Sequence, residues 1–142
     1  MKTFLSSCVL SVGLVGNIMA ACPGPDDANY ATIASLNLPG KMVCAQRGSD
    51  RWQEQHNGTA SVGGTVVDFK KGPSDPVDPS KLVGSWRVDR TAPKVIVYDY
   101  GTGGVYSYRA RTTSGVLSSL CPVNPPGPEI PATLKPSGSS CP

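Results

Sequence analysis

The sequence lacks most of the features that mark large functional classes of proteins. It has one histidine, no two cysteines in a CxxC spacing and no GxSxG motif. These absences argue against a zinc site, a redox-active dithiol and a serine-hydrolase nucleophile elbow. No run of helical length has a 3.6-residue apolar period, and after residue 20 no apolar run approaches the roughly 20 residues that span a bilayer. We therefore expect no metal, no cofactor and no membrane span.

The sequence also lacks an excess of charge of one sign. It holds 13 Lys and Arg against 10 Asp and Glu, and the basic residues are scattered along the chain. A nucleic-acid-binding domain usually gathers its basic residues on one face or along one helix. We therefore expect no nucleic-acid partner.

What the sequence does have begins with the pattern of an export signal. Lys2 precedes an apolar run from Phe4 to Gly16, and small residues follow at Ala20 and Ala21. The apolar run is too short to make a stable membrane span. The pattern predicts a signal peptide over residues 1–20 and a single β domain over residues 21–142, located in the periplasm or secreted. A chain of that length suits one hydrophobic core.

The cysteines bear on a second interpretation of this segment. Met19-Ala20-Ala21-Cys22 is similar to a bacterial lipobox, with Met where Leu is usual, and would attach a lipid to Cys22. Loss of the signal leaves an even number of cysteines, which suits two disulfides in an oxidising compartment: Cys22, Cys44, Cys121 and Cys141. We favour the disulfides over the lipid anchor. Spacing leaves three pairings open, and we expect Cys22 with Cys44 and Cys121 with Cys141, since each pair encloses a short segment.

The distribution of glycine and proline predicts the fold class. The 16 glycines and 14 prolines cluster between short β-like runs, about eight in number. This spacing is typical of an all-β protein, and we expect a small antiparallel β-barrel or sandwich. Residues 94–101 and 105–111 form the clearest hairpin. Residues 30–37 alternate like a strand, and Asn57-Gly58 is the strongest two-residue hairpin turn.

One predicted strand, residues 81–90, carries a large aromatic side chain. Alternation puts Leu82, Gly84, Trp86 and Val88 on one face. Trp86 would be either the floor of a ligand site or the plug of a small core. We favour the plug, because small barrels are mostly filled by their own side chains.

Two other stretches are candidate binding sites. A strand over residues 50–56 would place Trp52, Glu54 and His56 on one face, where Glu54 could raise the pKa of the imidazole and orient it for proton transfer. The other stretch is an aromatic hairpin whose same-face tyrosines offer rigid area and hydroxyl groups to a carbohydrate or protein: Tyr98, Tyr100, Tyr106 and Tyr108. Either surface could instead pack as ordinary core or solvated face, and for the tyrosines we favour packing on the core.

Several short motifs resemble known groups of proteins. The segments DRWQEQHNG, DFKKGPSDPVDPSKLVGSW and YDYGTGGVYSY, within residues 44–135, resemble small exported bacterial proteins of unassigned function that share the order RWQE, DPVDP and VGxW. That resemblance implies a bacterial exported protein and carries no activity. Gly84-Ser85-Trp86 also resembles the Gly-x-Trp of lipocalin and avidin-type barrels, in which the tryptophan closes one barrel end, although there it lies near the start of the domain.

These observations predict an exported, non-catalytic β domain that binds a protein or a small ligand. One alternative is a small hydrolase or isomerase that uses Glu54 and His56. A structural envelope component is the other. Catalysis would require His56 and a carboxylate within hydrogen-bond reach in a cleft.

Overall fold

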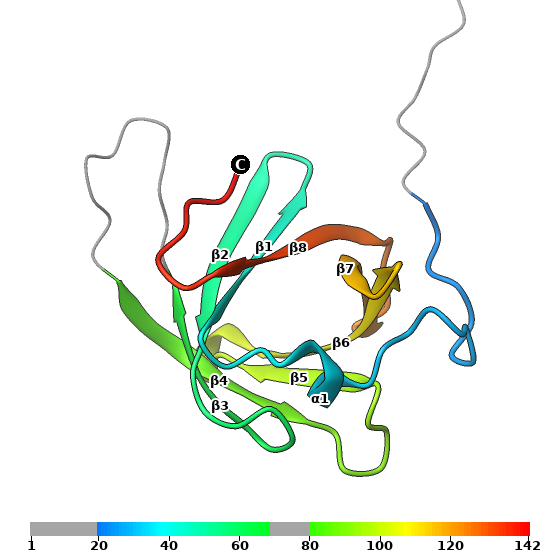
Figure 1. Cartoon of the computed structure of the whole chain (residues 1–142), viewed down its shortest axis with the longest axis horizontal. Helices are drawn as coiled ribbons and strands as arrows, with labels where there is room; N and C mark the ends of the chain where they lie inside the picture. The colour runs from blue at the N-terminus through cyan, green and yellow to red at the C-terminus, as the bar shows by residue number, and fades with distance from the viewer. Residues whose placement is uncertain (1–19, 69–79) are drawn as a thin grey trace, which may run out of the picture.

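The computed structural model describes residues 20–68 and 80–142, which form a closed antiparallel β-barrel (Figure 1). A short helix precedes the strands, and one 3-10 turn lies between the fifth and sixth strands. In chain order the elements are α1 (Ile33–Leu36), β1 (Lys41–Arg47), β2 (Asp50–His56), β3 (Gly63–Asp68), β4 (Lys81–Val88), β5 (Val95–Asp99), η1 (Gly101–Gly103), β6 (Val105–Thr113), β7 (Val116–Asn124) and β8 (Ile130–Pro136).

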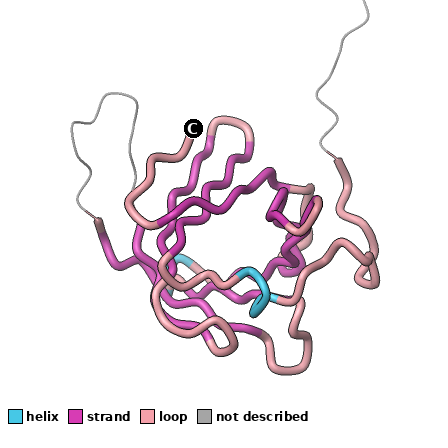
Figure 2. Tube along the Cα trace, viewed as in Figure 1, coloured by secondary structure: helices cyan, strands magenta, loops and turns pink. Residues whose placement is uncertain are grey.

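Each strand pairs with the next one along the chain, and the ring closes where β8 pairs with β1. The closing register runs from Lys41 opposite Pro136 to Ala45 opposite Ala132. Figure 2 shows the strands as a continuous ring around the core. Among the described residues, closure gives each strand a neighbour on both sides, and β7 and β8 pair only at Ser119–Pro131 and Leu120–Ile130. The predicted all-β class is confirmed. The sequence left two architectures open, a barrel and a sandwich, and the structure is a barrel.

Tight turns join several of these strands. Ser114 and Gly115 form the two-residue turn between β6 and β7, and both have positive φ, 52° and 79°. A turn of this type matches the twist of an antiparallel hairpin. The predicted hairpin of β5 and β6 is confirmed. The two-residue turn predicted at Asn57-Gly58 is wrong, because the connection from β2 to β3 runs through residues 57–62.

The segment before β1 closes one end of the barrel. It was predicted as a strand over residues 30–37, and that prediction is wrong, since Ile33–Leu36 is one helical turn. Within residues 30–37 the buried residues are Tyr30, Ile33 and Leu36, which are spaced by three and not by two. The Ile33 amide donates to the Pro93 carbonyl in the β4–β5 connection, at 2.9 Å. α1 therefore covers the end of the barrel that contains this connection.

A bulge between β3 and β4 changes which β4 residues face inward. Val66 lies opposite Gly84, but Val67 lies opposite Leu82, so one residue of β4 has no opposite partner. Trp86 faces inward and is 2% exposed, whereas Leu82 is 62% exposed. The predicted common face of Leu82 and Trp86 is therefore wrong.

The two disulfides join Cys22 to Cys121 and Cys44 to Cys141, each with 5.6 Å between Cα atoms. The predicted pairing of Cys22 with Cys44 and of Cys121 with Cys141 is wrong. Barrel closure explains the difference. β8 pairs with β1, so the segment after β8 returns across β1 and β2, where the Cys141 amide donates to the Gln53 side chain at 3.2 Å. Each disulfide ties a terminal segment to the outside of the barrel.

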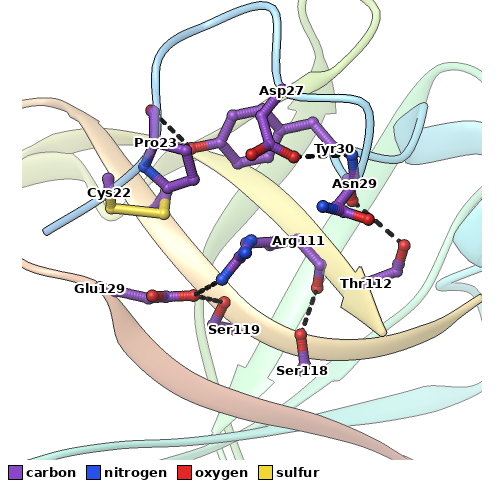
Figure 3. A network of polar contacts seen from close by, with 11 residues as sticks. Cys22, Pro23, Asp27, Asn29, Tyr30, Arg111, Thr112, Ser118, Ser119 and Glu129 are labelled. Atoms are coloured by element: carbon purple, nitrogen blue, oxygen red, sulfur yellow. Dashed lines mark hydrogen bonds and ion pairs between the residues drawn. A yellow bond between two sulfur atoms is a disulfide. The ribbon is translucent and has the colours of Figure 1, made fainter. Parts of the chain in front are cut away.

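Figure 3 shows how the N-terminal segment is held against β6 and β7. Beside the Cys22–Cys121 disulfide, the Tyr30 hydroxyl donates to the Pro23 carbonyl at 3.0 Å. The Arg111 guanidinium lies 3.2 Å from the Glu129 carboxylate, which also accepts a hydrogen bond from the Ser119 hydroxyl. These contacts form a polar network around one disulfide.

Two disulfides favour an oxidising environment outside the cytoplasm. The sulfur of Cys22 is bonded to Cys121, so in this structure it cannot carry the lipid thioether of the alternative interpretation. In the described ranges, no helix has both the length and the apolar character that crossing a membrane requires. The predicted export signal, apart from Ala20, and the DPVDP motif lie outside the described residues.

Candidate ligand-binding cavity

A small cavity lies inside the barrel, in the half opposite α1. Its position follows from the strand directions, because Trp52 lies near the β1–β2 turn and Tyr100 precedes η1, and both connections are at the end away from α1. The lining residues come from β1, β2, β7, β8 and the β5–β6 hairpin: Val43, Ala45, Trp52, Glu54, Tyr98, Tyr100, Tyr108, Leu120 and Ile130. We call this space the barrel cavity.

The barrel cavity is small. The space open to the centre of a water-sized sphere is about 40 Å³. One water molecule needs on the order of 10–15 Å³ by this measure, so the cavity holds a few waters or a compact group. A long hydrophobic ligand would require the surrounding side chains to move.

Glu54 supplies the carboxylate of the barrel cavity. The side chain comes from β2, faces inward opposite Val43 and is 9% exposed. The Tyr100 hydroxyl donates to both carboxylate oxygens, at 2.8 and 3.0 Å. This contact joins residues 46 positions apart, across the interior of the barrel. A glycine makes room for Tyr100, since a Cβ on Gly84 would lie 3.1 Å from the Tyr100 ring and 2.3 Å from the Asp99 carbonyl oxygen.

The tyrosines of the β5–β6 hairpin face the barrel interior. Tyr98 and Tyr100 are nearly parallel, with ring centroids 6.0 Å apart, and Tyr108 meets Tyr98 edge-on at 5.9 Å. Tyr98 is 2% exposed, so the packing on the core that we favoured is present. Tyr106 does not line the barrel cavity; its hydroxyl donates to the Gly103 carbonyl at 3.1 Å.

Burial and the Glu54 charge act together on these tyrosines. The pKa values of Tyr98, Tyr100 and Tyr108 are all raised, first by burial and next by the negative charge of Glu54. All three phenols therefore stay protonated at neutral pH. The Glu54 charge therefore acts on side chains of the β5–β6 hairpin, across the cavity from β2.

His56 belongs to the core and not to the cavity. It is 0% exposed, and both ring nitrogens have hydrogen-bond partners. Nδ1–H donates to the backbone carbonyl of Glu54 at 3.0 Å, since a carbonyl can only accept. Nε2 therefore accepts from the Tyr98 hydroxyl at 2.8 Å. Burial lowers the His56 pKa from 6.5 to about 4, which leaves the ring neutral at physiological pH.

This arrangement corrects part of the sequence interpretation. β2 does place Trp52, Glu54 and His56 on the inward face, as predicted. However, the Glu54 group bonded to the imidazole is its backbone carbonyl, and burial outweighs that bond, so the pKa of His56 falls where a rise was predicted. A buried imidazole tied at both nitrogens is poorly suited to exchange protons with a substrate.

Trp86 fills the half of the barrel nearer α1. It is absent from the cavity wall, its indole N–H donates to the Asn57 carbonyl at 2.9 Å, and its ring meets His56 edge-on at 5.5 Å. The position is that of a plug. The ligand-site role considered for Trp86 has no support in this geometry.

Trp52 lies at the opposite end of the interior and is only half-buried. The Arg47 guanidinium lies over its ring, 5.4 Å from the centroid, and 3.9 Å from the Asp50 carboxylate. The aliphatic wall formed by Val43, Ala45, Leu120 and Ile130 was not predicted as part of any site. Local alternation does not single them out, since residues 42–45 are all apolar and all buried, and only barrel closure brings the wall to Glu54.

In the described parts of the chain, no group of three His, Cys, Asp or Glu side chains is arranged to hold a metal ion. No protein-family model, curated protein or solved structure matches the chain. The site must therefore be interpreted from its own geometry.

Proposed function

We propose that this protein is an exported, non-catalytic binding protein that takes up a small organic ligand in the barrel cavity. The predicted signal peptide and the two disulfides support a periplasmic or secreted location. A binding function agrees with the position of His56, which is enclosed in the core and away from the cavity wall.

The observation that carries this proposal is the placement of Glu54. Its carboxylate is held by Tyr100 in a cavity walled by aromatic side chains, and the side chains leave space beside it. Burying a charged group in a small core costs free energy of folding, and well-packed apolar residues in its place often give equal or greater stability. Stability alone therefore does not explain a carboxylate at this position. An apolar cavity with a few fixed polar groups is the usual form of a small-molecule site.

The proposal is tested by screening small neutral, cationic and anionic organic molecules against the protein by ligand-observed NMR. We expect a subset of compact compounds to bind. In a second step, Ala45→Leu fills the cavity from its β1 wall and should abolish binding of those compounds. The matched control is Ala34→Leu, the same substitution at an exposed position of α1.

Two results would overturn the proposal. One is a screen in which no compound binds the unmodified protein. The other is binding that survives Ala45→Leu as well as it survives Ala34→Leu, because the ligand would then lie outside the barrel cavity.

A further inference from the structure

We propose that the Cys44–Cys141 disulfide is a thiol-exchange site on the outside of the folded barrel. An external dithiol reduces this bond and releases residues 137–142, which we call the strap, from the outer face of β1 and β2. The proposal is independent of the ligand of the barrel cavity, because the strap lies on the other side of these strands.

The strap runs along the outer face of β2 (Figure 1). It follows β8, and three of its groups form hydrogen bonds with side chains of β2: the Ser137 hydroxyl, the Cys141 amide and the Pro142 carbonyl, at 2.6, 3.2 and 3.2 Å. Their partners are alternate residues of the strand, which share one face: Gln55, Gln53 and Arg51. Trp52 and Glu54 lie between them in the sequence and line the barrel cavity, so the strap is on the outside.

These hydrogen bonds are too few to hold the strap without the disulfide. Among the described residues, two further bonds join the strap to the barrel, from the Ser137 amide to the Gly40 carbonyl and from the Ser139 amide to the Pro136 carbonyl, both at 3.1 Å. The strap sequence SGSSCP offers little apolar surface, and each of its residues is exposed or half-buried. Ordering one residue usually costs more free energy than one hydrogen bond returns, and here five bonds order six residues. The disulfide therefore keeps the strap in place.

A surface groove gives a thiol access to the disulfide. The space in this groove that is open to the centre of a water-sized sphere is about 170 Å³, and both Cys44 and Cys141 line it. The rest of its wall comes from β2, β7 and β8 and includes Arg51, Ser118 and Thr133. Cys44 is 6% exposed and Cys141 is half-buried, so an incoming thiolate meets Cys141 first. Access to the sulfur is one of the factors that set the rate of thiol–disulfide exchange.

The exchange takes two steps and needs a dithiol as co-reactant. One thiolate of the dithiol attacks Sγ of Cys141 and forms a mixed disulfide, while the Cys44 sulfur leaves with the electron pair of the broken S–S bond and takes up a proton. The second thiolate of the dithiol then attacks the first sulfur of the same reagent, and Cys141 leaves as a thiolate that takes up a proton. The dithiol is oxidised to its own disulfide, and the protein gains two thiols.

The Cys22–Cys121 disulfide differs, because other contacts hold Cys22 in place. Tyr30 is 3% exposed, and its hydroxyl donates to the carbonyl of Pro23, the residue next to Cys22 (Figure 3). Residues 29–31 are also hydrogen-bonded to β6. If this bond opens, its two sulfurs stay close together, so their effective concentration is high and the bond closes again. A dithiol therefore opens the disulfide of the strap selectively.

The first test titrates the unmodified protein with dithiothreitol under native conditions. Free thiols are alkylated at each concentration and located by peptide mapping. We expect alkylation of Cys44 and Cys141 at an about tenfold lower dithiothreitol concentration than alkylation of Cys22 and Cys121. Amide hydrogen exchange on the same samples should show that the strap loses protection while the strands of the barrel keep theirs.

A second test removes each disulfide by substitution. In the Cys44→Ser/Cys141→Ser protein, the strap amides should exchange about tenfold faster or more than in the unmodified protein, with the barrel amides unchanged. Cys22→Ser/Cys121→Ser is the matched control, in which residues 29–31 and the strap should both keep their protection. If either variant does not fold, the titration of the unmodified protein still decides.

The proposal fails on any of three results. One is alkylation of all four cysteines at the same dithiothreitol concentration. Another is a strap that stays protected after its disulfide is reduced, since the hydrogen bonds alone would then hold it. The third is loss of protection throughout the barrel together with the strap, which would make this disulfide a structural element of the fold and not an exchange site.

Discussion

The buried imidazole of His56 predicts a specific acid sensitivity. The unfolded chain takes up a proton at His56 near pH 6.5, whereas the folded protein does so only near pH 4. Acidification between these values therefore favours the unfolded state. Stability from this group is complete above pH 6.5, falls as the pH drops toward 4, and is constant below that. A pKa difference of this size amounts to about 3 kcal/mol.

The assay compares the wild type with His56→Gln by urea unfolding under non-reducing conditions. At pH 7.5 the variant should be less stable by about 2 kcal/mol, because it disturbs the bonds to Tyr98 and to the Glu54 carbonyl. The difference between the two proteins should shrink by about 3 kcal/mol between pH 7 and pH 4, so that the curves cross. The carboxylates titrate in both proteins alike, so their contributions to the unfolding free energy largely cancel in the difference.

Two results would refute this reasoning. The first is a stability difference that stays constant from pH 7.5 to pH 4. The second is an NMR titration in which the imidazole carbon signals of the folded protein move with a midpoint near 6.5. Since the chain has one histidine, the signals need no assignment.

Substitutions at three other places in the barrel test further contacts. Gly84→Ala places a methyl group 2.3 Å from the Asp99 carbonyl oxygen, and should destabilise the barrel by about 2 kcal/mol in urea unfolding; an unchanged midpoint would contradict the close approach of β4 and β5. With the Cys22–Cys121 disulfide retained, replacing Cys44 and Cys141 by Ala opens the covalent loop that runs through residues 22–44 and 121–141 and should cost about 4 kcal/mol of unfolding free energy. In the Cys44→Ala protein, peptide mapping should place the free thiol at Cys141, whereas a free thiol at Cys22 or Cys121 would contradict the pairing. Arg47→Gln removes the cation that lies over the Trp52 ring and should destabilise the protein by roughly 0.5–1 kcal/mol in urea unfolding; an unchanged midpoint would contradict this contact.

Much of the fold could be predicted from local patterns. Strands leave a two-residue period, and glycine and proline mark their ends, so the strand count and the β5–β6 hairpin follow from the sequence. The inward direction of Trp52, Glu54 and His56 follows from the same alternation. These features depend on residues that are close together in the sequence, which is why they could be predicted from it.

Other features depend on distant parts of the chain. The single turn of α1 is too short for a helical period to appear, and the bulge that turns Leu82 outward leaves no composition signal. The disulfide pairing depends on the closure of β8 onto β1. The contact of Tyr100 with Glu54 also exists only in the closed ring, so the cavity could not be assembled from strand patterns alone.

The positions of the two disulfides in the sequence determine when each can form. The cysteine partners are 99 and 97 positions apart, and each bond joins a residue near one terminus to a strand from the other half of the molecule. In a chain that emerges N-terminus first, Cys22 has no correct partner until β7 has emerged, and Cys44 has none until Cys141 has emerged. Native oxidation must then follow the emergence of β7 and of Cys141, so an oxidoreductase that acts earlier can make only bonds that must later be exchanged.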